Sequence, residues 1–247
     1  MNWIEPRVNR RRGYGANTSI RAQHARAILG PVRLQERLAF WRQFHNQFNS
    51  TGAIQPSSRF LARAMTEPLR DRRPSREVRV VEMGPGTGAV TRRIAEAMRP
   101  GDRLDCFELN PDFTSYLERL VATEPSLAAH GAAIEVHVGD AAEARIDAPA
   151  DFVVCSVPLN NLPPEAAAGI LEAGRRLWTG GGWFTYFEYV GLPRLRKLTA
   201  PAEERARLGA VRTLKSRFRE AGGSSCLVLR NIPPARAVHV PLPPHAA

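Results

Sequence analysis

The sequence predicts an α/β fold: a doubly wound sheet of seven strands with an amphipathic helical extension at its N-terminus. Three features predict this fold. A short apolar run from Val78 to Glu82 leads into a turn with three glycines, and a helix-like pattern follows at once. Four further apolar runs then alternate with helix-like stretches, and two strand-like runs close the chain. Strands that alternate with helices in this way form a mostly parallel sheet with helices on both faces.

The remaining elements are assigned from apolar periodicity and from residues that start and stop helices. The strands predicted after the first are Arg103–Glu108, Ala133–Val138, Asp151–Cys155, Trp183–Tyr189, Cys226–Arg230 and Ala237–Val240. The predicted helices run from the glycine turn to about Met98, from the cap at Asn110-Pro111, and over Glu165–Trp178 and Glu203–Ala221. We expect the last two strands to form an antiparallel hairpin, so that one edge strand of the sheet is reversed.

The chain upstream of the sheet is unusually basic. Residues 1–42 hold nine arginines against two glutamates, and we predict a flexible basic arm over residues 1–30. Such a segment seeks phosphate groups, on nucleic acid or on an anionic membrane. The alternative is a tail that only aids solubility. We assign residues 31–70 to amphipathic helices that cover a membrane or substrate site, and residues 71–247 to the sheet domain.

A stripe of apolar residues at helical spacing begins the second segment. It contains three aromatics, and its members are Leu34, Leu38, Trp41, Phe44 and Phe48. Arginines flank the stripe, which suits a helix that lies in a layer of lipid headgroups. An ordinary amphipathic helix packed on the domain would show the same pattern. Pro56, Ser57 and Ser58 then begin a second helix, Arg59–Met65.

Cysteines, histidines and hydropathy exclude several classes of protein. Cys106, Cys155 and Cys226 form no disulfide framework, and we expect all three to be buried in or beside strands. The six histidines show no ligand spacing, so we predict no metal site. No apolar run is long enough to span a bilayer, and no secretory signal follows the first arginines. An arginine-rich, acid-poor arm is also found in transit peptides, which leaves that alternative open.

The glycine turn by itself leaves the cofactor ambiguous, because Gly84-x-Gly86-x-x-Ala89 also fits a dinucleotide site. Glu82 comes two residues before the first glycine, and we expect it at the mouth of the turn. A carboxylate there would repel a pyrophosphate but attract an ammonium or a sulfonium. Gly88 adds a third point of close backbone approach. These residues favour S-adenosylmethionine (SAM).

Acids at the ends of the next two strands strengthen this interpretation. Glu108 ends the second strand, where a carboxylate can accept hydrogen bonds from ribose hydroxyls. Asp140 follows the third strand and can accept from the adenine amino group, with the Ala141 N–H beside it. Three acids that merely cap helices are the alternative. The predicted cofactor-binding residues are Glu82, Gly84, Gly86, Thr87, Gly88, Glu108, Asp140 and Ala141.

Several motifs resemble known families. EMGPGTG, FELN and GDA resemble the SAM-binding motifs of class I methyltransferases over about residues 78–190. GAIQPSSRFLARAM, VPLNNLP, FTYFEYVGLPRLRKL and RNIPPARAV resemble the bacterial phospholipid N-methyltransferase family over roughly residues 31–240. The resemblance implies a Rossmann-like methyltransferase sheet and methylation of the amine of phosphatidylethanolamine or its methylated forms. Relatives of that family methylate ornithine lipids. The arm before residue 31 has no counterpart in either family.

The acceptor amine is expected near the ends of the fourth and fifth strands. The amine must be neutral to attack, so a carboxylate that takes its proton would help. We predict Tyr186, Glu188 and Tyr189 as catalytic residues, with aromatic faces that could hold a methylated cation. Each tyrosine is equally compatible with an ordinary core position. The predicted substrate-binding residues are Ser57, Ser58, Pro158 and Asn160.

Two other functions compete with lipid methylation. EMGPGTGAVT also resembles ribosomal RNA adenine dimethyltransferases, and the arm is basic. Those enzymes stack a flipped base on an aromatic directly after the fourth strand, where this chain has SVPLNN without an aromatic. A non-catalytic SAM- or lipid-binding module is the other alternative. We therefore expect a cytoplasmic protein, peripheral on the inner face of the membrane through its arm and helix 34–48, and no nucleic-acid partner.

Overall fold

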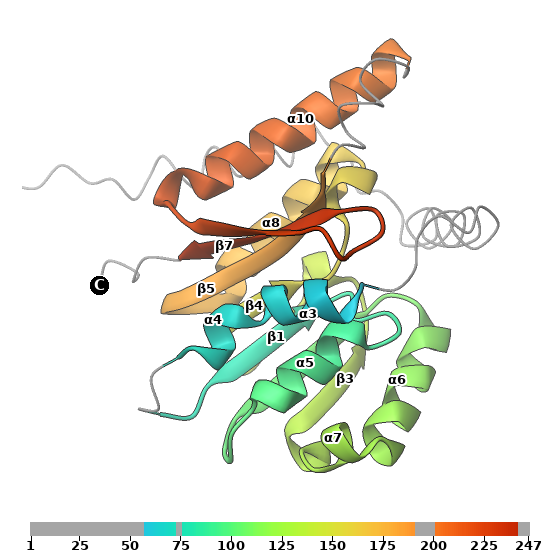
Figure 1. Ribbon diagram of the computed structural model, residues 1–247, viewed down its shortest axis with the longest axis vertical. Coiled ribbons are helices and arrows are strands. Elements are labelled where there is room, and N and C mark those ends of the chain that lie inside the picture. The colour runs from blue at the N-terminus through green and yellow to red at the C-terminus, as the bar shows by residue number, and fades with distance from the viewer. Residues whose placement is uncertain (1–56, 73–75, 191–200, 242–247) are drawn as a thin grey trace, which may run out of the picture. The chain divides into compact units, whose positions relative to one another are not determined.

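A computed structural model describes residues 57–72, 76–190 and 201–241 (Figure 1). The predicted arm 1–30 and the apolar stripe 34–48 lie outside these residues, so the flexible arm and the amphipathic helix remain predictions. Helix α3, Arg59–Met65, has the bounds that the sequence predicts, and the Ser58 hydroxyl caps it by accepting from the Leu61 N–H. Within the described residues, no helix has both the length and the apolarity to cross a membrane.

The seven predicted strands form one sheet in the order β3-β2-β1-β4-β5-β7-β6. Their bounds are β1 Arg79–Met83, β2 Arg103–Glu108, β3 Ile134–Val138, β4 Ala150–Cys155, β5 Trp178–Tyr189, β6 Ser224–Val228 and β7 Ala235–Pro241. Strands β1 to β5 pair in parallel, whereas β7 is antiparallel to both β5 and β6. The chain order and the parallel pairing place the carboxyl ends of β1 to β6 at one edge of the sheet, which we call the carboxyl edge.

Helices cover both faces of the sheet, as a doubly wound fold requires (Figure 1). The residues buried with one face come from α3, α4 (Glu67–Arg70), α5 (Ala89–Ala97), α6 (Pro111–Thr123) and α7 (Pro125–Ala128). The other face is buried under α8 (Pro164–Leu177) and α10 (Ala202–Phe218). Short 3₁₀ turns complete the described elements: η1 Gly131–Ala133, η2 Ala141–Glu143, η3 Leu159–Asn161 and η4 Arg219–Ala221.

The reversed strand is not at the edge of the sheet, which corrects the prediction. Strand β7 lies between β5 and β6, and β6 forms the edge. The side chains explain the order, because β7 buries Ala235, Ala237, Val238 and Val240 on both of its faces. Residues 224–227 of β6 are exposed. The more apolar strand of the hairpin therefore takes the inner position.

Two further predictions change for related reasons. Cys106 and Cys155 are buried as expected, but Cys226 is exposed because it lies on the edge strand. Strand β5 begins at Trp178, directly after α8, and not at Trp183 as predicted, so Gly180, Gly181 and Gly182 belong to the strand. At Gly182 the backbone packs so closely on the Asp151 carbonyl that a Cβ would overlap it. Glycine at this position therefore allows β5 to pack directly against β4.

Candidate functional site

The glycine turn connects β1 to α5 at the carboxyl edge. Gly84, Gly86 and Gly88 have φ values of 71°, 54° and 76°, a region that favours glycine. A Cβ at Gly84 would overlap the Val157 side chain, and one at Gly88 would lie 2.9 Å from Leu120 Cδ2. At Gly86 a Cβ would meet nothing within 4 Å. The outer glycines are thus packed against the protein, whereas Gly86 faces open space that a ligand can approach.

Glu108 connects the end of β2 to this turn. Its Oε2 accepts the Gly86 N–H at 3.0 Å, and its Oε1 accepts the Asn110 N–H at 2.9 Å. Burial raises the pKa of this carboxyl, and the backbone hydrogen bonds partly oppose the rise. A carboxylate accepts about four hydrogen bonds, so lone pairs remain for ligand hydroxyls. Glu108 therefore holds the turn and keeps capacity for a ligand.

Glu82 lies beneath the turn rather than at its mouth. It is fully buried, and its two oxygens accept from the hydroxyls of Thr91 at 2.6 Å and Ser156 at 2.8 Å. Burial raises the pKa of Glu82 to about 7, and the charge of Glu108 adds to the rise. The expectation of an open carboxylate at the mouth is therefore wrong. Whether Glu82 serves the cofactor through its charge stays a prediction.

Asp140 and Ala141 follow β3 on the same edge. The Asp140 Oδ1 accepts the Ala142 N–H at 2.8 Å and so caps η2. The Gly139 N–H donates to the Glu108 carbonyl at 2.8 Å, which keeps the two strand ends adjacent. Because β3, β2 and β1 are neighbours, the three predicted acids lie in consecutive positions along one edge. Thr87 lies in the turn itself, and its carbonyl accepts from Arg92 Nη1 at 3.0 Å.

The acceptor side contains a hydrogen-bond network around a buried lysine that the sequence did not reveal. Lys215, on α10, donates from Nζ to Asn160 Oδ1 at 2.7 Å and to Glu188 Oε2 at 2.6 Å. Burial lowers the pKa of Lys215, and the charge of Glu188 opposes the shift. Lys215 thus connects two predicted site residues, Asn160 in η3 and Glu188 in β5. No motif marks Lys215, since its helix is mostly polar and its partners are distant in sequence.

The predicted catalytic residues of β5 divide between the two faces of the sheet. Tyr186 belongs to the core under α8 and α10, on the side of Glu188, whereas Tyr189 packs with Phe187 on the opposite face. Burial raises the pKa of both tyrosines, that of Tyr189 to about 12. Among the described residues, the buried Tyr186 hydroxyl has no hydrogen-bond partner. Only Tyr186 and Glu188 can therefore act from the same side of the strand.

The serines predicted for substrate binding lie elsewhere on the carboxyl edge. The Ser58 hydroxyl is used as the helix cap, and its N–H donates to Asn231 Oδ1 at 2.9 Å. Ser57 precedes the cap and is half-buried. Pro158 comes before η3 and is half-buried, next to the loop that carries Asn160. These substrate assignments remain predictions, and Asn231, which lies in the RNIPPARAV motif but was not among the predicted site residues, anchors α3 to the last hairpin.

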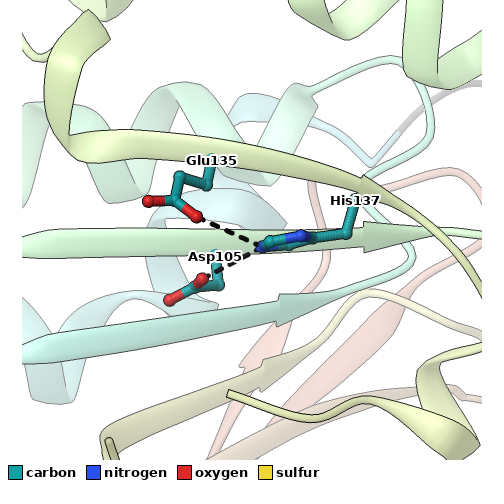
Figure 2. Close-up of side chains that lie close together, drawn as sticks. All are labelled: Asp105, Glu135 and His137. Carbon is teal, nitrogen blue, oxygen red and sulfur yellow. Dashed lines mark hydrogen bonds and ion pairs between the residues drawn. The ribbon is translucent and has the colours of Figure 1, made fainter. Parts of the chain in front are cut away.

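One group of side chains in the described residues could hold a metal ion. Figure 2 shows Asp105, Glu135 and His137 with ligand atoms all within 4.8 Å of one another. His137 Nε2 lies 3.0 Å from Asp105 Oδ1 and 3.9 Å from Glu135 Oε2. Arg79, however, donates to both Asp105 oxygens, at 2.7 and 3.2 Å, and so already neutralises the carboxylate. We interpret the group as an ion-pair network between strands, and the predicted absence of a metal site stays a prediction.

Several solved structures that share this fold are methyltransferases. The O-methyltransferase TomG from Streptomyces achromogenes, in complex with SAM, covers 91% of this chain and 96% of its own at 18% identity and a TM-score of 0.55. An O-methyltransferase from Bacillus cereus, in complex with SAH, covers 88% and 96% at 12% identity and a TM-score of 0.55. The glycopeptide N-methyltransferase MtfA with SAM covers 73% and 87% at 16% identity and a TM-score of 0.53. These likenesses define the class I methyltransferase fold.

Sequence comparison narrows the class. The family described as "Methyltransferase domain" matches residues 80–182, which contain the glycine turn and all three strand-end acids. The ornithine lipid N-methyltransferase of Singulisphaera acidiphila is 27% identical over 155 residues, 61% of this chain and 77% of that protein. This chain is a SAM-dependent methyltransferase, and SAM is its cofactor.

Proposed function

We propose that this chain methylates the amine of a membrane-lipid headgroup, either phosphatidylethanolamine and its methylated forms or ornithine lipid. The observation that carries the proposal is the similarity to an ornithine lipid N-methyltransferase over three quarters of that protein's length. The acceptor side supports it through Glu188, whose Oε2 accepts from Lys215 and whose Oε1, 3.9 Å from Arg219 Nη1, could take a proton from the amine.

The residues around the glycine turn fit SAM. Open space at Gly86 leaves room for a ligand against the backbone, and Gly84, Thr87 and Gly88 shape the turn. Glu108 would accept from the ribose hydroxyls and Asp140 from the adenine amino group, with the Ala141 N–H beside it. When bound, the cofactor supplies a methyl group on a positively charged sulfonium, which a neutral amine can attack. Glu82 would stabilise positive charge from beneath the turn.

Glu188 and its partners would prepare the acceptor. An alkylammonium has no free lone pair, so a group near the amine must accept a proton before methyl transfer. Glu188 is the candidate acceptor, and Lys215 fixes its carboxylate beside Asn160. The Tyr186 hydroxyl, on the same side of β5 as Glu188, could hydrogen-bond the amine, whereas Tyr189 lies on the opposite face and would not contact the same group. Ser57, Ser58 and Pro158 would line the approach of the headgroup.

Access to a membrane lipid needs a protein that binds the membrane surface. The basic arm and the apolar stripe 34–48 are the segments we propose for this contact, with the protein peripheral on the inner face of the cytoplasmic membrane. RNA methylation finds less support, because residues 156–161 contain no aromatic on which a base could stack. A purely SAM- or lipid-binding role would leave the ordered acceptor network without a task.

Transfer from labelled SAM tests the proposal. The full-length protein is incubated separately with phosphatidylethanolamine, ornithine lipid and ribosomal RNA, and label is counted in each acceptor. We expect label in one aminolipid, at least about a hundredfold less with Glu188→Gln, and no change with Glu172→Gln, an exposed glutamate on α8. Label in RNA alone, or in none of the acceptors despite bound SAM, would refute lipid methylation.

A further inference from the structure

The connection between β6 and β7 exposes an unusual amount of apolar surface. We call residues 227–234 the hairpin tip, which forms the red loop in Figure 1. Leu227, Leu229 and Ile232 are 50%, 69% and 76% exposed, and Val190, at the end of β5, is 37% exposed. Of the six large hydrophobic side chains that are exposed in the described residues, four lie here. Such a concentration of exposed apolar side chains indicates a binding surface.

Hydrogen bonds hold the tip in this exposed position. The Asn231 side chain is buried, accepts the Ser58 N–H at 2.9 Å and donates to the Pro233 carbonyl at 2.7 Å. The Val190 N–H donates to the Pro234 carbonyl at 2.7 Å. The tip is therefore tied to both α3 and β5. Because Asn231 is buried between them, its neighbours Leu229 and Ile232 are held on the outside rather than folded onto the core.

Two arginines lie against Phe60 of α3, and one of them, Arg230, belongs to the hairpin tip. The guanidinium carbons of Arg59 and Arg230 lie 4.9 and 5.2 Å from the centroid of the Phe60 ring. Residues 224–236 contain two arginines and residues 58–65 contain two more, and neither segment contains an acid. Apolar side chains with arginines beside them match the structure of an anionic bilayer, which has phosphates above an apolar interior. A protein partner of opposite charge would instead need acids to face these arginines.

The tip lies on the side of the sheet where the methyl transfer is expected. Strand β6 is parallel to β5, so its carboxyl end and the tip share the carboxyl edge with the glycine turn and Glu188. We propose that the hairpin tip inserts Leu229 and Ile232 into an anionic bilayer while Arg59 and Arg230 bind lipid phosphates. Docking in this way turns the carboxyl edge towards the headgroups, and this orientation rests on the proposed function.

A probe at the tip tests insertion separately from any binding by the arm. An environment-sensitive fluorophore is attached to Ile232→Cys in full-length protein that also carries Cys226→Ser. The other two cysteines are buried and should not react. The matched control carries the probe at Arg103→Cys, an exposed position at the opposite edge of the sheet. Vesicles contain equal amounts of phosphatidylglycerol and phosphatidylcholine. We expect an apolar shift and quenching by lipid-embedded quenchers at position 232, and neither at position 103.

Unlabelled variants measure what the tip contributes. Leu229→Ser with Ile232→Ser should lower vesicle partitioning by about tenfold or more, because two side chains lose their apolar environment. Arg230→Ser should lower it about fivefold at low salt, whereas Arg103→Ser should leave it unchanged. A probe at position 232 that stays water-exposed on bound protein would overturn the proposal, as would absence of vesicle binding or a response to RNA instead of vesicles.

Lipid methylation is measured on the same samples, which separates this inference from the proposed function. If the protein methylates an aminolipid in detergent micelles but the probe at position 232 stays exposed to water, insertion of the hairpin tip is rejected and lipid methylation is retained. A bilayer-inserted probe without methylation of any aminolipid would retain the tip as a membrane contact and reject the function.

Discussion

Replacing Glu82 by glutamine tests the role of the buried carboxyl beneath the glycine turn. Glutamine has the same shape, and the hydroxyls of Thr91 and Ser156 can rotate so that one donates to the amide oxygen and the other accepts from the amide nitrogen. The variant should therefore fold with the turn intact. What it loses is a titrating group, so its stability should differ from that of the parent in a pH-dependent way.

The raised pKa sets the size of the effect. A change in the pKa of Glu82 from 4.5 to about 7 on folding favours the protonated form by about 3 kcal/mol. Between these values the folded protein keeps a proton that the unfolded chain has lost, so stability falls as pH rises towards 7. Relative to the parent, Glu82→Gln should gain about 2 kcal/mol between pH 5 and pH 8.

Urea unfolding of the ligand-free proteins from pH 5 to pH 8 measures this gain. Glu118→Gln, an exposed position on α6, is the control and should show no pH-dependent difference. A constant difference between Glu82→Gln and the parent at all pH values would refute the argument from burial.

Titration with two ligands shows what the charge of Glu82 does for the cofactor. Glu82→Gln should weaken SAM, and it should weaken S-adenosylhomocysteine less, because the latter lacks the sulfonium charge. For the parent protein, SAM affinity should rise from pH 6 to pH 8 as the carboxyl ionises. Equal losses of affinity for both ligands would indicate that Glu82 acts on the ammonium group that both carry. Unchanged affinities would show that Glu82 does not contribute to cofactor binding.

Three further substitutions probe the turn, the acceptor network and the entry of α3. Gly86→Ala should cost about 1 kcal/mol of stability, because of its positive φ, and lower SAM affinity about tenfold or more, as measured by calorimetry. Lys215→Met should lower turnover by about tenfold or more with little change in SAM affinity, since Glu188 and Asn160 lose their shared donor. Ser58→Ala should lower the free energy of unfolding by about 1 kcal/mol through loss of the helix cap, as measured by denaturant unfolding.

Each substitution has a matched control. Gly209→Ala, in α10 with open space around it, should not lower stability or SAM affinity. Arg217→Met, exposed on the same helix as Lys215, should keep full turnover. Ser57→Ala should leave stability unchanged. An unaltered SAM affinity in Gly86→Ala, full turnover in Lys215→Met, or equal stability of the two serine variants would each contradict the corresponding assignment.

Local patterns in the sequence determined the elements and the cofactor side of the site. The apolar runs and the helix caps predict most strands and helices because these depend on neighbouring residues. Parallel strands bring their carboxyl ends to one edge, so acids that end three successive strands had to meet there. The order of elements in the chain therefore sufficed to place Glu108 and Asp140 near the glycine turn.

Only the tertiary structure decided how distant segments meet. The sequence of the last hairpin does not show that β7 pairs with β5, which leaves Cys226 exposed on the edge strand. The burial of Glu82 and the contact of Lys215 with Glu188 depend on side chains that approach from separate elements. The same holds for the hairpin tip, because Leu227 and Leu229 lie in the predicted strand Cys226–Arg230 and no local pattern indicates that they and Ile232 are exposed. Periodicity specifies which face of an element is apolar, but packing between elements decides which apolar residues find a partner.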